Sequence, residues 1–311
     1  SARLRGAQLD ASGTALVTAG ADTLRLWRVP AAAAATTTEA SVARASAFAL
    51  ARGGERVVIG FESGQIEFVE AGDIGRVGAR QRNAVAGHQG SVTAATLAAA
   101  GAVAATGGAD GTVRIWDVAS AAPVGVVMQP TTAPISHVAL SADGRWIASA
   151  AARIVRVAST ADGRVVREFP PGAAIEALVF SPDGAALAVG DAVGRVMLIG
   201  VEDGRRVFDV RLDAGIGALA FGADVLAVGD AAGGVRLLRL GDGEASAPPL
   251  RLPQGVRWLD WSAGCALLAA TRDWLHVLRT TERGLVSTHA RFAPRPVPTA
   301  ALAAVGDTTI R

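Results

Sequence analysis

The chain of 311 residues contains no lysine and no tyrosine, and it has a single cysteine. Without lysine it cannot form a phosphate-binding loop of the Walker type, which requires one. The lone Cys265 excludes a disulfide bond within the chain, and its Ala and Leu neighbours predict a small core residue. No run of about 18 strongly apolar residues occurs, so we expect no membrane-spanning segment.

The charge of the chain is nearly balanced. It has 30 basic residues, all of them arginine, against 28 acidic ones, so the net charge is only +2 although the isoelectric point is 9.7. Because arginine keeps its charge to about pH 12, a small arginine excess raises the isoelectric point far. The arginines form no run, and we predict no nucleic-acid partner. Abundant Ala, Arg and Gly without Lys favour a bacterial source.

A short hairpin pattern recurs along the chain. In GGADGTVRIWDV (residues 107–118), the Asp-Gly pair predicts a tight turn and the alternating residues after it predict a strand. Similar turn-and-strand copies occupy residues 20–29, 62–70, 151–159, 192–201, 232–240 and 271–280. The chain therefore holds seven copies of this unit.

Two further turns complete each repeat. Ser-Pro-Asp-Gly within residues 179–191 and Ser-Ala-Asp-Gly within residues 139–150 precede the hairpin strand, and Asp-Gly pairs at 162, 203 and 242 follow it. Each unit then reads as four strands with a period of roughly 40 residues, which is the spacing of propeller blades.

The best copy resembles the WD-repeat β-propellers. It has Gly87-His88, then Asp110-Gly111, then Trp116-Asp117, whereas Trp27 in the first copy is followed by Arg28. The resemblance covers about residues 3–296 and implies an all-β, seven-bladed β-propeller of four-stranded antiparallel blades. We treat residues 1–311 as one propeller domain.

The end of the chain leaves a second blade count open. Residues 299–311 copy residues 14–27 with one deletion. Residues 297–311 are therefore either a tail hairpin that covers an exposed sheet edge or part of an eighth, incomplete blade. We favour seven blades, with residues 286–292 as the outer strand of the last one.

The resemblance also implies a structural tetrad in the third blade. In this family a His, a hydroxyl, a turn Asp and a Trp form a hydrogen-bonded chain across the blade, and His88, Thr106, Asp110 and Trp116 match it. A catalytic His–Asp pair with a hydroxyl nucleophile uses the same residue types. We favour the structural role, because the repeat context explains all four residues.

A binding surface is expected where the innermost strands begin. In a blade of this type, that end of the strand and the turn between the second and third strands lie on one face. The second residues of the innermost strands are Arg5, Ser46, Thr93, Ser136, Glu176, Gly217 and Arg257. The turns add Asp22, Glu62, Arg153, Asp191, Asp230 and Arg272. From these we select Arg5, Glu176, Arg257 and Arg272 as binding residues, together with Trp258. Trp258 has an alternative role in packing between blades seven and one.

The remaining polar residues predict no metal or cofactor. His137, His276 and His289 lie in different repeats without metal-ligand spacing. The Gly-x-Gly-x-x-Ala pattern within residues 214–220 enters a strand rather than a helix, so it predicts no dinucleotide site. Asp260 lies on an innermost strand, where a carboxylate needs a partner such as Arg257.

These features predict a non-catalytic scaffold that binds a protein or peptide and is monomeric as an isolated domain. It would be one domain of a larger bacterial protein. A ligand-sensing domain of a signalling or transport protein is the alternative, and an enzyme that uses the central channel ranks lower. We favour a cytoplasmic location and keep a periplasmic one open, because a chain that begins with Ser1 fits an excised domain.

Overall fold

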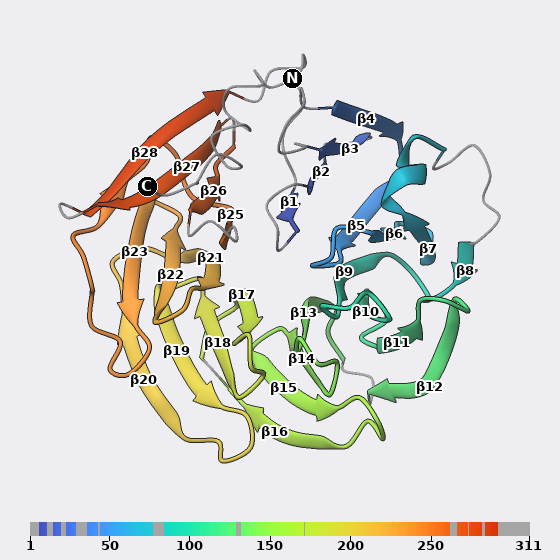
Figure 1. The fold of residues 1–311 in the computed structure, drawn as a ribbon. Coiled ribbons are helices and arrows are strands. Elements are labelled where there is room, and N and C mark those ends of the chain that lie inside the picture. Colours follow the sequence, from blue (N-terminus) through green and yellow to red (C-terminus); the bar gives the residue numbers. More distant parts are fainter. Residues whose placement is uncertain are drawn as a thin grey trace.

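Seven four-stranded antiparallel sheets stand around a common axis in the computed structural model (Figure 1). In each sheet the strands follow one another in chain order. The prediction of seven four-stranded blades is therefore confirmed. The structure describes residues 6–10, 15–19, 23–28, 36–42, 44–76, 84–128, 132–170, 172–261, 266–272, 274–281 and 284–291.

The first four blades contain the strands β1 (Gly6–Leu9), β2 (Ala15–Ala19), β3 (Thr23–Arg28), β4 (Thr36–Ser41); β5 (Ala45–Leu50), β6 (Arg56–Phe61), β7 (Gln65–Glu70), β8 (Ala84–Ala86); β9 (Val92–Leu97), β10 (Val103–Gly108), β11 (Val113–Asp117), β12 (Ala122–Met128); and β13 (Ile135–Leu140), β14 (Trp146–Ala151), β15 (Ile154–Ser159), β16 (Val165–Phe169).

The last three blades contain β17 (Ile175–Phe180), β18 (Ala186–Asp191), β19 (Arg195–Gly200), β20 (Arg206–Arg211); β21 (Ile216–Phe221), β22 (Val225–Asp230), β23 (Gly234–Arg239), β24 (Leu250–Arg251); and β25 (Trp258–Trp261), β26 (Leu267–Ala270), β27 (Trp274–Thr281), β28 (Gly284–Arg291). The 3-10 helix η1 (Ala71–Arg76) follows β7. In the described ranges no helix is long and apolar enough to cross a bilayer.

Blades two to six each bury both of their faces against their neighbours. In β18, Leu187 and Val189 pack against blade four, while Ala188 between them packs against blade six. Clusters of this kind join successive blades from the first to the seventh. A strand buried on both faces reads as a continuous apolar run, which explains the positive mean hydropathy of +0.35.

The Ser-x-Asp-Gly turns are held by their own side chains. The Ser181 hydroxyl donates to Asp183 Oδ1 and accepts the backbone N–H of Ala186, and the same carboxylate oxygen accepts the N–H of Ala185. Gly184 follows with a φ of 72°, which glycine adopts without strain. The turn is therefore specified by local hydrogen bonds, and Ser141 and Asp143 repeat it in blade four.

The start of the innermost strand contains a bulge in five blades. The pairing register with the second strand shifts after the first residue of β5, β9, β13, β17 and β21. The second residue is left outside the regular ladder. Its side chain is thus available for contacts at this end of the ring, which we call the rim face.

Among the described residues, no strand is shared between blades seven and one where the ring closes. β28 pairs with β27 of its own repeat, and β25 of blade seven neighbours β1 of blade one. Residues 286–292 were expected to form the outer strand, and β28 begins two residues earlier. The predicted tail, residues 297–311, lies outside the described residues.

Blades six and seven approach each other closely at Gly217, the second residue of β21. A Cβ atom at this position would overlap the carbonyl oxygen of Val256, which immediately precedes Arg257. Val256 is itself buried between the two blades. This contact therefore excludes every side chain at position 217.

Replacing Gly217 with Ala should destabilise the ring by about 1–3 kcal/mol, because the buried Val256 backbone has to move away from the added methyl group. Chemical denaturation measures the change. Gly53→Ala is the matched control, since nothing lies within 4 Å of a Cβ there. Equal stabilities for the two variants would contradict the close contact.

Candidate functional site

A pocket of about 720 Å³ opens on the rim face between blades five and seven. Three kinds of segment line it: the starts of β17 and β21, the connections that lead into β21 and β25, and the turns after β18, β22 and β26. The lining residues are Glu176, Ala192, Gly215, Ile216, Gly217, Ala231, Gln254, Gly255, Val256, Arg257 and Arg272. We call this the rim pocket.

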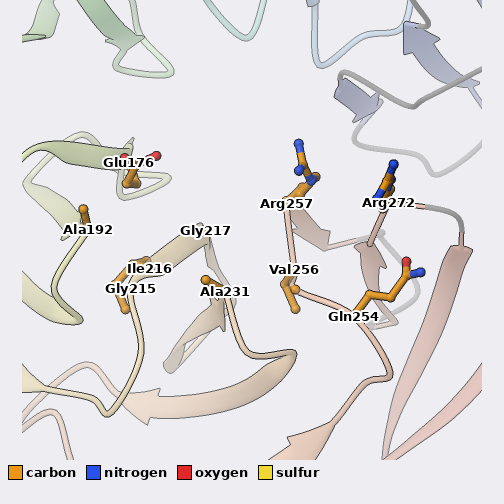
Figure 2. Close-up of a pocket in the computed structure, with 11 residues that line it drawn as sticks. Glu176, Ala192, Gly215, Ile216, Gly217, Ala231, Gln254, Val256, Arg257 and Arg272 are labelled. Carbon is orange, nitrogen blue, oxygen red and sulfur yellow. The ribbon is translucent and has the colours of Figure 1, made fainter.

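The rim pocket brings together three of the five residues selected from the sequence. Glu176 extends from β17 on one side, and Arg257 and Arg272 extend from blade seven on the other (Figure 2). The two arginine side chains point in the same direction in this view. All three residues are exposed, and within the described part of the chain no ion pair joins them. The pocket therefore presents a carboxylate opposite two guanidinium groups.

Glycines form much of the pocket floor. The connection that contains Gly215 crosses the turn of blade five, and the Ala231 N–H donates to the Gly215 carbonyl at 2.8 Å. A Cβ at Gly215 would meet the Ala192 carbonyl, and one at Gly255 would meet that of Ala231. Close backbone packing therefore keeps side chains off the floor. Sequence reasoning missed Gly215 and Gly255, although an isolated glycine before a strand is a signal of such an approach.

In blades two, three and four, the second residue of the innermost strand is a serine or threonine whose hydroxyl bonds to a backbone carbonyl. The Ser46 hydroxyl donates to the Val92 carbonyl of the next blade at 2.6 Å, and the Thr93 hydroxyl likewise lies against the Ile135 carbonyl. Ser136 bonds to the Ala150 carbonyl within its own blade at 3.2 Å. A second hollow of about 290 Å³ lies there, and its described lining includes His137 but no Arg, Asp or Glu. Of these two hollows, only the rim pocket has charged side chains in its described lining.

Trp258 and Arg5 are not placed in this pocket. Trp258 is half-buried and does not line it. Its register matches Ala177 and Ala218, which pack against the next blade, so its position fits packing toward blade one. Arg5 lies outside the described residues, so its place at the rim stays a prediction.

Asp191 and Asp230 differ from the expectation that their turns present them at the rim. Both are buried, with exposed fractions of 1% and 3%. Asp191 Oδ1 accepts the backbone N–H groups of Val193 and Arg195, and Asp230 Oδ1 accepts those of Ala232 and Gly234. These carboxylates hold the turn instead of facing a ligand, which corrects the sequence interpretation.

The four tetrad side chains of blade three form one hydrogen-bonded chain. The Trp116 indole N–H donates to the Thr106 hydroxyl at 2.9 Å, and that hydroxyl lies 2.8 Å from His88 Nε2. His88 Nδ1 lies 3.1 Å from Asp110 Oδ1. Because the carboxylate can only accept, Nδ1 carries the proton and Nε2 accepts from Thr106. A neutral imidazole thus satisfies every group.

The pKa values of the tetrad agree with a neutral histidine beside a carboxylate. Burial lowers the pKa of His88 below its usual 6.5, against the opposing effect of the Asp110 hydrogen bond. Burial alone would raise the pKa of Asp110. The hydrogen bonds from the Gln89 and Thr112 backbone, the Thr112 hydroxyl and His88 outweigh it and lower the pKa to about 2.

A register comparison shows why blades five and six lack the tetrad. Gly108 ends β10 at the position that Asp191 and Asp230 occupy in β18 and β22. A Cβ at Gly108 would overlap His88 and Asp110. The same space therefore holds either a His–Asp pair above a glycine or a single aspartate side chain.

Blade one retains the Trp–hydroxyl half of this hydrogen-bonded tetrad. The Trp27 indole N–H donates to the Thr18 hydroxyl at 2.9 Å, as Trp116 does to Thr106. Sequence reasoning missed Thr18, which the alignment of the two tryptophans could have identified.

Asp260 in blade seven accepts the Trp261 backbone N–H at 2.9 Å. In the part of the chain that the structure describes, no cluster of three His, Cys, Asp or Glu residues could hold a metal ion.

Comparison with known families places this fold. The family model described as the Nucleolar protein 10-like, N-terminal domain, a β-propeller, matches residues 35–192, which is half of the chain. The chain belongs to this family. The match extends from the outer strand of blade one to the end of β18, so it includes the tetrad and Glu176 but ends before Arg257 and Arg272. No curated protein matches the chain.

We predict that His88→Ala lowers the free energy of unfolding by about 1–3 kcal/mol, because Asp110 and Thr106 each lose a buried partner. Thermal and chemical denaturation measure it. Thr18→Val is the comparison, since it breaks only the Trp27 bond and should cost less. A loss of partner binding without any loss of stability would contradict the structural role.

The stability contributed by His88 should depend on pH. Its folded-state pKa is lowered, so as the pH falls below 6.5 the unfolded chain binds a proton that the folded chain resists. The contribution is present above pH 6.5 and is lost as the pH falls toward the folded-state pKa. The gap in stability between wild type and His88→Ala should therefore narrow from about pH 8 to about pH 5. A gap that widens on acidification would show that the folded state prefers the protonated imidazole.

Proposed function

We propose that this propeller is a non-catalytic scaffold that binds a protein or peptide partner through its rim face. The observation that carries the proposal is the rim pocket, where Glu176 lies opposite Arg257 and Arg272 on a floor of glycine backbone. A pocket of this size lies within the range of about 300–1,000 Å³ that is usual for small-molecule sites, so the chemistry of its lining, not its volume, has to identify the occupant.

The tetrad supports a structural scaffold rather than a catalyst. Thr106 is completely buried, and the His88 side chain is shielded from solvent. A hydroxyl nucleophile has to reach its substrate, and this one is enclosed between blades. The residue types that resemble a catalytic triad therefore serve the packing of blade three.

The described lining of the rim pocket contains no paired acid and base. Glu176 has no hydrogen-bond partner for its carboxylate among the described side chains, and the guanidinium groups of Arg257 and Arg272 offer hydrogen-bond donors but no acceptor that could take a proton from a substrate. These groups suit recognition by charge and hydrogen bonding. Membership of a propeller family agrees with this, since propellers serve as rigid platforms on which binding loops are presented.

Other parts of the proposal come from the sequence. The balanced charge favours a protein partner over nucleic acid, and we keep a monomeric domain of a larger protein as the expected state. The bacterial source stays a prediction, which the genomic context of the gene would check.

The test compares partner binding by the two faces of the ring. Arg257→Ala and Arg272→Ala should each lower the affinity for a partner isolated by affinity capture about tenfold, because each removes a positive charge from the rim pocket. Isothermal titration calorimetry with the purified partner measures this.

Arg205→Ala and Asp224→Ala are the controls, because both residues are exposed on turns at the opposite end of the blades. They should leave affinity unchanged. If these two variants lose binding while the rim variants keep it, the partner surface is the other face.

A further inference from the structure

We propose that the rim pocket binds an acidic side chain of a peptide segment, with Arg257 and Arg272 holding its carboxylate and Glu176 holding an N–H or cationic group beside it. This inference rests on the proposed function and adds the chemistry of the partner. It identifies the occupant as a mixed-charge peptide that contains Asp or Glu.

Arg257 and Arg272 differ from the arginines that form ion pairs. Several arginines on the strands pair with an acidic side chain of the neighbouring strand, as Arg156 does with Glu168 and Arg195 with Asp209. Arg257 and Arg272 have no such acidic partner among the described residues, and both line the same pocket. Two guanidinium groups that line one pocket without an acidic partner suit a carboxylate ligand, because each planar group can donate two parallel hydrogen bonds to it.

Glu176 restricts what else can enter. A carboxylate in the same pocket repels a group with several negative charges, such as a nucleic-acid backbone or a polyphosphate. It attracts backbone N–H groups and basic side chains. A peptide with an acidic residue and a hydrogen-bond donor close to it can bind both the arginines and Glu176. A polyanion can bind the arginines but is repelled by Glu176.

The pocket lining favours a peptide over a small organic molecule. Pockets for small molecules are lined mainly by apolar and aromatic side chains. The described lining here contains no aromatic residue, and its apolar side chains are Ala192, Ala231, Ile216 and Val256. A small acid would gain little from such walls, while a peptide gains further contacts on the rim outside the pocket.

The floor is already in its final shape. Gly217 and Gly255 are fixed by contact with the backbone of the neighbouring blade or turn, so the space above them does not have to be opened by a ligand. A preformed site avoids the cost of ordering loops when a short peptide binds.

The experiment selects a random peptide display library against the immobilised wild-type protein. The Arg257→Ala/Arg272→Ala double variant and Arg205→Ala are selected in parallel. We expect peptides enriched in Asp or Glu on the wild type and on Arg205→Ala, and loss of these peptides on the double variant. A labelled synthetic copy of an enriched peptide should bind the double variant at least tenfold more weakly. Thermal melting of each variant confirms that the fold is intact.

Charge exchange supplies a second measurement. The Arg257→Glu variant should reject the enriched peptide and accept a copy in which its acidic residue is replaced by Lys. Glu176→Gln should weaken binding of a peptide with a basic neighbour, whereas Glu55→Gln, at an exposed turn elsewhere, should not. A merely structural role for Arg257 would not produce the reversal.

The outcomes separate the two proposals. Enrichment of peptides without acidic residues, or equal binding by the double variant, would overturn the acidic occupant while leaving a peptide-binding scaffold in place. No enrichment on any variant would overturn the scaffold function itself. If free succinate stabilises the wild type against heat, does not stabilise the double variant, and no peptide is enriched, the site is one for small carboxylic acids.

Discussion

Neighbouring blades are in close contact where the residue that opens or leads into one innermost strand packs against the end of the second strand of the blade before it. Gly60, Gly107, Gly190 and Gly229 give room there to Val92, Ile135, Ile216 and Val256. These four partners are buried. The contact fixes the spacing of these blades around the axis, and in the blades with a bulge the next residue of the innermost strand faces the rim.

That bulge position decides what the rim can do. On blades two and three a hydroxyl at this position donates a hydrogen bond to the next blade, so it is not available to bind a partner. On blade six the carbonyl of Val256 lies so near that only Gly217 fits. On blade five Glu176 points outward, and Arg257 does so at the entry to β25. The rim pocket therefore forms where charged groups replace the bonding hydroxyls and a glycine leaves space between them.

The fold could be predicted from the sequence because each repeat is defined by residues that are close together in the chain. Turn glycines such as Gly184 and short apolar strands recur in most of the copies, so the strands and the blade count follow from neighbouring residues alone. The gathering of Glu176, Arg257 and Arg272 followed from aligning the copies. Asp191 and Asp230 were assigned wrongly, because a turn position does not reveal whether a side chain points outward or back onto the turn N–H groups. The glycine floor depends on contacts between blades, which no single repeat contains.

A rigid ring and a charged pocket are linked by the same packing. Blades five and six are packed on both faces and blade seven packs on blade six, so the buried contacts connect the strand that carries Glu176 to the blade that carries Arg257 and Arg272. The distance between the two walls is thus set by buried Leu, Val and Ala side chains rather than by the charges themselves. Attraction between Glu176 and the arginines does not close the pocket, because moving the walls together would require repacking two blade interfaces at once. The unlike charges are held apart by the core, and their capacity for hydrogen bonds is left for a partner that can bridge them.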